Sequence, residues 1–243
     1  MNRVLLKTPV AAPMRQQVVD ILRDAITDHL FEPGGRLTER ELCESLGVSR
    51  STVREGLRQL EAEGLVQIRP NKGPMVIELS EEDARHIYAI RAKLQGLAAA
   101  ACAKNPPPDL LPALQKLLTA IKNAQRTGNY RNLQAARTSF YNLIFDGSGN
   151  PHLSILLRQL RARVTLMRGL EGLREERMQE ATRGANLVLD AIRAGDTKAA
   201  ARVAEEHIEH AAELVFAARK AAIAKSSRPK KAPTRARRSS AVS

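Results

Sequence analysis

The sequence is poor in the residues that mark extracellular and membrane proteins. Its 243 residues include two cysteines, no tryptophan and only 3% aromatic residues. Two cysteines cannot form a disulfide framework, so we expect a protein of the reducing cytoplasm. No apolar run approaches the ~18 residues of a membrane span, and Lys7 and Pro9 interrupt the apolar part of the first segment. We therefore expect neither membrane association nor a secretory signal.

Acidic residues are scarce relative to basic ones. The chain has 39 Lys and Arg against 26 Asp and Glu, a formal net charge of +13, which indicates a polyanionic partner such as nucleic acid. The charge is uneven, because Met1–Leu79 is neutral, Ser80–Ala224 carries +6 and Lys225–Ser243 carries +7 without any acid. The last segment lacks apolar periodicity, so we expect a disordered tail that is either simply solvated or a non-specific nucleic-acid arm.

The N-terminal third of the chain carries the signals of three helices and a hairpin. An apolar stripe at helical spacing predicts a helix over about Pro13–His29. Thr38 and Glu41 form a capping-box pattern ahead of a short second helix, and Ser49 is a favourable N-cap for a third. Two runs with strand alternation then flank the turn-forming segment Pro70–Pro74. This order is that of a winged helix-turn-helix domain.

The third predicted helix has an apolar face and a basic face. At ~100° per residue, two sets of residues lie about 90° apart: Val53, Leu57 and Leu60, and Arg50, Arg54 and Arg58. Arginine can bind guanine in the major groove by two hydrogen bonds, and hydroxyls in the first turn of a helix suit phosphate. The arginines could instead form a solvated surface balanced by nearby glutamates, but the adjoining hairpin favours DNA binding.

Three ungapped segments of this region resemble the DNA-binding domain of GntR-family bacterial transcription regulators: Pro33–Leu42, Leu46–Leu57 and Leu60–Val66. The resemblance implies a regulator that binds double-stranded operator DNA sequence-specifically. It assigns base contacts to Arg40, Arg50 and Arg54, phosphate contacts to Ser49, Ser51 and Thr52, and the minor groove to the wing tip at Lys72 and Gly73. The role of Asn71 at that tip stays open.

The remainder of the chain predicts only helices. Ser80 and Asp109 stand at N-cap positions, Pro151 suits a first helical position, and Pro- or Gly-containing links separate the segments. About six helices with short links make an antiparallel bundle. The expected fold is mainly α: a winged helix-turn-helix over residues 1–79, an antiparallel all-helical bundle over 80–224 and a disordered basic tail over 225–243.

Four stretches of the bundle resemble the all-helical, FCD-type effector-binding domain of the fatty-acid-regulator branch of the GntR family: Ile90–Leu94, Ser148–Leu153, Asp190–Asp196 and His207–Ile208. Many members of that branch bind a divalent metal through one Asp and three His, and the metal holds a small carboxylate. At the four ligand places this chain has Arg137, Tyr141, Ala185 and His207. A guanidinium and a phenol cannot replace carboxylate and imidazole ligands, so we predict no metal and no cofactor.

A positive charge in place of the metal predicts a metal-free anion site. Arg137 and Tyr141 are four residues apart, so both can face the bundle interior, and a guanidinium can bind a carboxylate by two charge-assisted hydrogen bonds. Arg91 is either a second anion contact or a member of a structural ion pair. Alternatively, Arg137 points to solvent and His207 is a packed bundle histidine. The candidate effector-binding set is Arg91, Arg137, Tyr141 and His207.

The sequence contains no catalytic motif that would indicate an enzyme. It has no Gly-rich phosphate loop, CxxC or HExxH pattern, and we expect Cys43 and Cys102 to be small buried hydrophobic residues. We expect a homodimeric, nucleoid-associated regulator that binds a near-palindromic operator. A small anionic metabolite, which we expect to be a carboxylate, should change its affinity for that operator. The competing hypothesis is a non-responsive architectural DNA-binding protein that uses the bundle only to dimerise.

Overall fold

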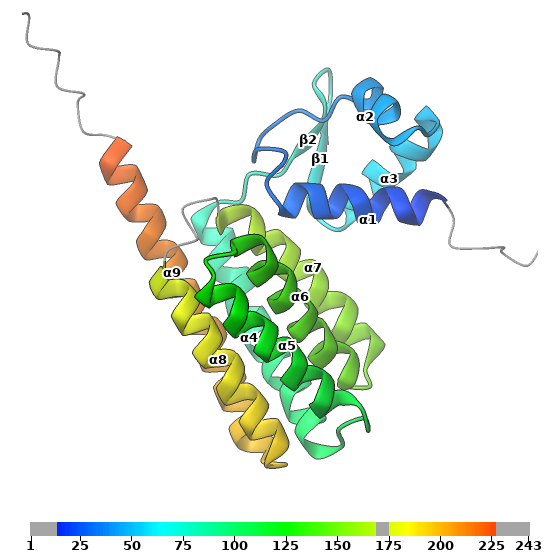
Figure 1. The fold of residues 1–243 in the computed structure, drawn as a ribbon. Coiled ribbons are helices and arrows are strands. Elements are labelled where there is room, and N and C mark those ends of the chain that lie inside the picture. Colours follow the sequence, from blue (N-terminus) through cyan, green and yellow to red (C-terminus); the bar gives the residue numbers. More distant parts are fainter. Residues whose placement is uncertain (1–13, 169–174, 227–243) are drawn as a thin grey trace, which may run out of the picture.

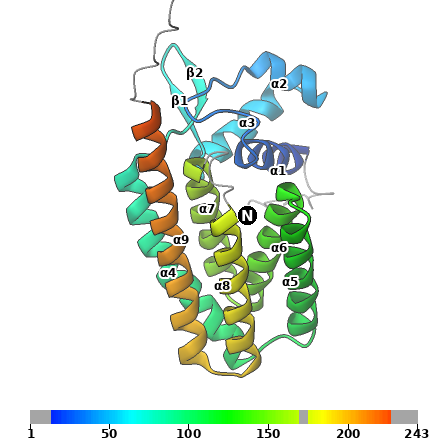
Figure 2. The ribbon, with the colours of Figure 1, turned by 60° about the vertical axis from the view of Figure 1, so that its left-hand side comes forward.

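The computed structural model describes residues 14–168 and 175–226, which are mainly α-helical. A small N-terminal domain sits on one end of a bundle of long helices (Figures 1 and 2). Within the described ranges, no helix is long and apolar enough to cross a membrane. The expected tail lies outside the described residues except for Lys225 and Ser226, which are the last two residues of a helix.

The N-terminal domain has three helices followed by a hairpin: α1 (Met14–Thr27), α2 (Glu39–Leu46), α3 (Arg50–Ala62), β1 (Val66–Arg69) and β2 (Gly73–Val76). Ser49 caps α3 as predicted, because its hydroxyl accepts a hydrogen bond from the backbone N–H of Thr52 at 3.2 Å. Thr38 precedes α2, but its side chain makes no capping hydrogen bond, so the predicted capping box does not form. The two strands pair antiparallel. The predicted winged helix-turn-helix is confirmed.

The bundle contains the remaining helices of the described chain: α4 (Glu81–Lys104), α5 (Leu110–Arg126), α6 (Tyr130–Gly147), α7 (Pro151–Arg168), α8 (Glu175–Arg193) and α9 (Thr197–Ser226). Local signals explain several of their ends. Ser80 caps α4 by accepting a hydrogen bond from the Asp83 backbone N–H at 3.0 Å, and α7 begins at Pro151, whose fixed φ suits a first helical position. Asp109 precedes α5 without capping it through its side chain.

Helices α4 and α9 pack against each other along much of their lengths. Gly96 permits this approach, because a Cβ at that position would lie 3.1 Å from the backbone carbonyl oxygen of Ala201 on α9 and 2.6 Å from Glu205 Oε1. Lys93 Nζ donates to Glu205 on the outside of the pair. Further along, Tyr88 packs edge-on against Phe216, with ring centroids 5.8 Å apart. These contacts set the axial alignment of α4 against α9.

Helix α7 belongs to all three apolar clusters of the described chain. Leu157 packs in the main bundle core, and Val164 packs in a second cluster with residues of α4 and α9. Ala162 and Leu166 instead belong to the cluster formed by α1, α3 and the hairpin of the N-terminal domain. The two domains are therefore joined by a shared apolar interface as well as by the chain.

Candidate nucleic-acid interface and buried polar cluster

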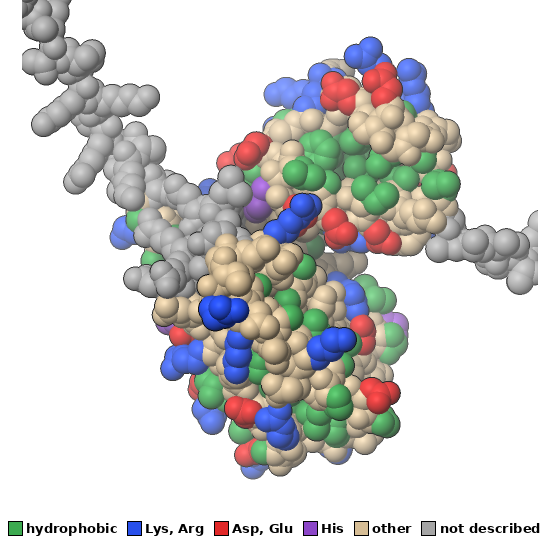
Figure 3. All heavy atoms as spheres, viewed as in Figure 1, with side chains coloured by type: hydrophobic (Ala, Val, Ile, Leu, Met, Phe, Trp, Pro, Cys, Tyr) green, Lys and Arg blue, Asp and Glu red, His purple; other side chains and the backbone are tan. Residues whose placement is uncertain are grey.

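Helix α3 has the two faces that its sequence predicts. Val53, Leu57 and Leu60 are buried, at 1% exposure or less, while the side chains of Arg50 and Arg54 are exposed. Basic side chains, interspersed with acidic ones, gather at the end of the domain that is remote from the bundle (Figure 3). The exposed face of α3 is therefore available to a partner, and its buried face holds the helix in the domain.

The first turn of α3 presents a cluster of hydroxyl groups. Ser49 Oγ lies 2.8 Å from Ser51 Oγ and 2.9 Å from Thr52 Oγ1. The first backbone N–H groups of a helix have no partner within it, and the helix dipole makes this end positive. Hydroxyl donors beside such an end suit a phosphate group.

Two of the arginines expected to contact bases form ion pairs on the domain surface. Arg54 Nε donates to both carboxylate oxygens of Glu39, at 2.8 and 3.0 Å. This contact orients Arg54 from the start of α2 and leaves its terminal nitrogens out of the pair. Arg40 is 72% exposed and its Nε lies 3.9 Å from Glu44 Oε1, a weak surface contact.

The wing tip between β1 and β2 uses a backbone conformation that favours Gly and Asn. Asn71 and Gly73 have φ angles of 63° and 77°, and nothing lies within 4 Å of a Cβ added at Gly73. Lys72 stands between them with an exposed side chain. Asn71, whose role the sequence left open, therefore shapes the tip, since Asn tolerates positive φ better than most residues.

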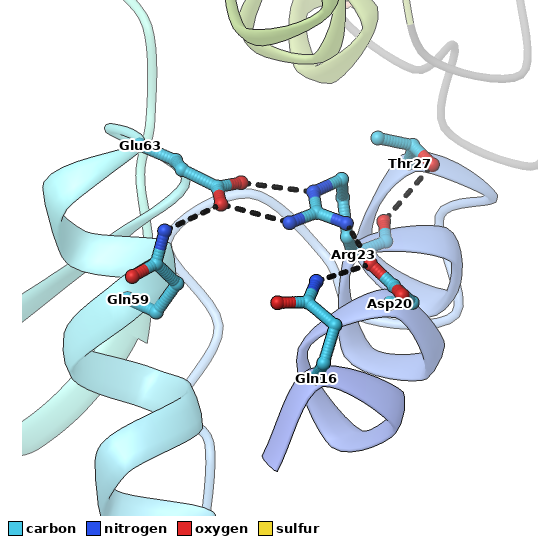
Figure 4. Close-up of polar contacts among 6 residues, drawn as sticks. All are labelled: Gln16, Asp20, Arg23, Thr27, Gln59 and Glu63. Carbon is cyan, nitrogen blue, oxygen red and sulfur yellow. Dashed lines mark hydrogen bonds and ion pairs between the residues drawn. The ribbon is translucent and has the colours of Figure 1, made fainter. Parts of the chain in front are cut away.

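The end of α3 is tied to α1 by an ion pair that the sequence did not predict (Figure 4). Arg23 donates from Nε and Nη2 to the two oxygens of Glu63, each at 2.8 Å, and from Nη1 to Asp20 at 2.5 Å. Gln59 Nε2 adds a hydrogen bond to Glu63 at 3.2 Å. Burial opposes the charge on Arg23, but the hydrogen bonds to Glu63 and Asp20 outweigh it and raise the pKa of Arg23.

Inside the bundle, Tyr141 and His207 form a buried polar pair. Tyr141 Oη lies 2.7 Å from His207 Nε2, and the two rings stack with an interplanar angle of 16°. His207 is 6% exposed, and the backbone of α8 closes over its ring. A Cβ at Gly184 would lie 1.9 Å from His207 Nδ1, so the imidazole fits only because residue 184 is a glycine.

Two arginines of the candidate effector set also lie within the bundle. Arg91 on α4 is 2% exposed, and its Nη2 lies 3.4 Å from Oε1 of Gln95, a long hydrogen bond. Arg137 on α6 is half-buried, and its Nη1 donates to Gln134 at 3.2 Å. Neither arginine points freely to solvent.

Helix packing puts Arg91 and His207 in the same part of the bundle. Along α4, Arg91 lies between Tyr88 and Lys93. These two residues contact Phe216 and Glu205 on α9, and His207 lies between Glu205 and Phe216. Because both side chains are buried, each faces the interior. The fold thus brings α4, α6 and α9 together around a set of buried polar groups.

Comparison with known proteins agrees with this architecture. The model described as "Bacterial regulatory proteins, gntR family" matches residues 14–76, and the FCD domain model matches residues 86–210. The chain belongs to the GntR family. The order of the two matches, DNA-binding domain first and FCD domain second, confirms the resemblance seen in the sequence.

Individual relatives support the same assignment. The chain is 28% identical over 199 residues to the uncharacterized HTH-type transcriptional regulator YdhC of Bacillus subtilis, across 82% of this chain and 89% of YdhC. It is 29% identical over 182 residues to the HTH-type transcriptional regulator McbR of Escherichia coli, across 74% and 82% of the two chains. The solved structure of E. coli McbR/YncC has a TM-score of 0.78 at 25% identity, covering 85% of this chain and 98% of that one.

These matches make the chain a DNA-binding transcription regulator of the GntR family rather than an enzyme, as predicted. Cys102 is buried in the core of the bundle. Its Sγ donates to the Ile144 carbonyl oxygen at 3.2 Å, and burial raises the pKa of the thiol to about 12. Cys102 is therefore a packing residue. Cys43 on α2 is only half-buried, so the expectation that it is buried is wrong.

The residues at the four metal places of this GntR branch do not fit a divalent ion. Ala185 has no donor atom, Arg137 is a cation, and Tyr141 is hydrogen-bonded to Nε2 of His207. Among the residues that the structure describes, no three His, Cys, Asp or Glu side chains gather into a possible metal site. A metal-free anion site remains our prediction.

Proposed function

We propose that this GntR regulator binds a small carboxylate in its helical domain and that the bound molecule changes its affinity for operator DNA. The pair of Arg91 and Gln95 carries the proposal. Arg91 supplies a permanent positive charge at 2% exposure. Gln95 is 1% exposed, and its Nε2 has no hydrogen-bond partner among the described residues. A buried donor without an acceptor costs about 1 to 3 kcal/mol, and a carboxylate oxygen would remove that cost.

The other members of the set complete the proposed site. Arg137 adds a second guanidinium on α6, one turn from Tyr141. Tyr141 and His207 hold each other in place and contribute hydroxyl and imidazole groups that bind by hydrogen bonding rather than by a fixed charge. Gln95 is added to the set of Arg91, Arg137, Tyr141 and His207. Unlike those four residues, it was not singled out from the sequence.

A thermal-shift screen with short mono- and dicarboxylates tests the proposal, since a ligand of the folded state must stabilise it. A ligand at ~100 times its Kd stabilises by about 2.7 kcal/mol. Arg91→Met and Arg137→Met should each reduce that shift, and His207→Ala should reduce it less than the loss of either charge. Arg193→Met, which removes an exposed arginine of α8, is the matched control.

The same screen separates this function from its alternatives. A chelator should change neither the shift nor DNA binding, and one metal per chain by elemental analysis would contradict the metal-free site. If no carboxylate stabilises the chain or alters its DNA affinity, the effector proposal fails. The chain would then be a regulator whose bundle serves dimerisation.

We also propose that the basic face of the DNA-binding domain reads the operator. Arg40, Arg50 and Arg54 contact bases, the hydroxyls of Ser49, Ser51 and Thr52 contact phosphates, and Lys72 and Gly73 enter the minor groove. The exposure of these arginines, the hydroxyl cluster at the start of α3 and the open space around Gly73 support these roles. Alanine substitution of Arg50 and Arg54, measured as the loss of affinity for the operator relative to random DNA, tests the base contacts.

A second copy of the chain is the partner we propose for α4. Ile90 and Leu97 are 53% and 60% exposed, and with the half-buried Leu94 they form an apolar stripe on one face. A near-palindromic operator needs two recognition helices, and a self-complementary stripe would provide the two-fold contact. Ile90→Glu with Leu97→Glu should give a monomer by sedimentation velocity, whereas Leu187→Glu, on α8, should not. A dimeric double variant would place the interface elsewhere.

A further inference from the structure

The bundle supplies part of the core of the DNA-binding domain. Ala162 and Leu166 of α7 are 8% and 2% exposed and pack with buried residues of α1, α3 and the hairpin. Helix α7 also contacts α1 directly, and both views show α1 lying across the end of the bundle (Figures 1 and 2). The position of the DNA-binding domain is therefore set by α7.

Arg163 of α7 lies over the turn that ends the recognition helix α3. Gly64, which follows that helix, has a φ angle of 72°, and a Cβ there would lie 3.0 Å from Arg163 Nε and 3.2 Å from its Cδ. The Nε is buried and has no hydrogen-bond partner among the described residues. The contact is therefore one of shape: a side chain at position 64 would press against the arginine.

The other side of α7 is fixed to α6. Arg161 Nη2 donates to Thr138 Oγ1 at 2.6 Å, and Arg158 Nη2 donates to Asp146 Oδ2 at 2.5 Å. Side chains two residues apart on a helix point in directions that differ by ~200°. Arg161 therefore faces α6, while Arg163 faces the DNA-binding domain. Helix α7 thus stands between the helix of the candidate effector site and the recognition helix.

We propose that Arg163 is a positioning residue for DNA binding: seated over Gly64, it sets the orientation of α3 relative to the bundle. A movement of α7 is then passed to the recognition helix at this point. The positioning role does not depend on the effector site, because it concerns the ligand-free chain. Only the further step, that an effector acts on α7 through α6, rests on the proposed function.

The first test is the affinity of the full chain for a DNA duplex that the wild type enriches from a random library. Arg163→Ala should weaken binding to this duplex by about 2- to 30-fold, the range for residues that couple two sites. Binding to a random duplex should change little, because phosphate contacts carry no sequence information. Arg163→Lys keeps the stem and the charge, so it should restore most of the affinity. If both variants melt at the wild-type temperature, a purely structural role cannot account for their difference in affinity.

A double-mutant cycle identifies the contact itself. Gly64→Ala and Gly47→Ala introduce the same methyl group at two positive φ angles, 72° and 65°, but nothing lies within 4 Å of a Cβ at Gly47. Arg163→Ala should therefore reduce the loss of affinity caused by Gly64→Ala at least about twofold and leave the loss caused by Gly47→Ala unchanged.

Three results would overturn the proposal. The first is an Arg163→Ala variant with wild-type affinity and preference. The second is an equal effect of Arg163→Ala on the two glycine variants, which would remove any special contact at Gly64. The third is a gain of specific affinity in Arg163→Ala, which would make the contact inhibitory. The single variant Arg163→Ala decides the question even if Gly64→Ala fails to fold.

Discussion

The ion pair between Arg23 and Glu63 allows a quantitative prediction about the DNA-binding domain. Arg23→Met keeps the apolar stem and removes the charge, while Glu63→Gln keeps the size and removes the charge. The two partners differ in environment, because the Glu63 side chain is 7% exposed and the Arg23 side chain is 26% exposed. The buried carboxylate should therefore tolerate the loss of its partner less well than the partly exposed guanidinium does.

The structure gives the size of each effect. Removing one partner of a buried ion pair costs about 3 to 5 kcal/mol. Arg23→Met should cost about 3 kcal/mol, the lower end, since the Arg23 side chain is 26% exposed and Glu63 keeps the hydrogen bond from Gln59. Glu63→Gln should cost about 1.5 kcal/mol, because Arg23 keeps Asp20 and contact with water. Replacing both residues with Met should bring stability within about 1 kcal/mol of the wild type.

Urea unfolding followed by two signals measures these losses. The chain has no tryptophan, and its three tyrosines all belong to the bundle: Tyr88, Tyr130 and Tyr141. Tyrosine fluorescence therefore follows the bundle, whereas far-ultraviolet circular dichroism follows the helices of both domains. The variants should move the part of the circular dichroism transition that comes from the DNA-binding domain to lower urea and leave the tyrosine midpoint nearly in place.

The order of the two single variants is the decisive result. If Glu63→Gln destabilises as much as Arg23→Met, the difference in burial does not control the energy and the reasoning fails. If both variants fall within about 0.5 kcal/mol of the wild type, the pair behaves as an ordinary surface ion pair despite its geometry. A double Met variant that is less stable than Arg23→Met would also contradict the argument.

Three further predictions concern DNA binding and the buried histidine. Arg50→Ala and Arg54→Ala should each cost about 1 to 3 kcal/mol on the selected duplex in competition binding; wild-type binding to both the selected and a random duplex by the two variants would place the base contacts elsewhere. Removing Lys225–Ser243 should lower non-specific affinity and its salt slope, since α9 projects beyond the bundle at the end that carries the DNA-binding domain (Figure 2); an unchanged slope would exclude a DNA-binding role. Gly184→Ala should destabilise the bundle by about 1 to 3 kcal/mol, because the methyl group would overlap His207; a rise in the tyrosine midpoint would contradict this packing.

Local sequence signals were enough to predict the helices and the wing. Ser49 and Ser80 cap the helices that they were predicted to begin, and α7 starts at Pro151. Thr38 shows the limit of such signals: the residue precedes α2, but its side chain takes no part in capping. A pattern states which bond is possible, while the surrounding chain decides the rotamer that makes it.

The contacts between distant residues could not be predicted from the sequence. Glu63 reads as a surface residue at the end of a helix, and only the packing of α1 against α3 puts Arg23 beside it. Arg163 lies on a helix whose arginines are spread around its circumference, and no pattern marks Gly64 as the residue it covers. In the sequence, Gly184 is an ordinary helix-destabilising glycine, and only the structure shows that His207 lies beside it.

The shared core of α7 also limits how freely the two domains can be recombined. Residues 14–79 joined to the bundle of another regulator would expose the surface that Ala162 and Leu166 cover here. A working chimera must therefore carry matching residues on the new seventh helix, including a side chain that fits over Gly64. The unit that can be exchanged between relatives is the DNA-binding domain together with the face of α7 on which it rests.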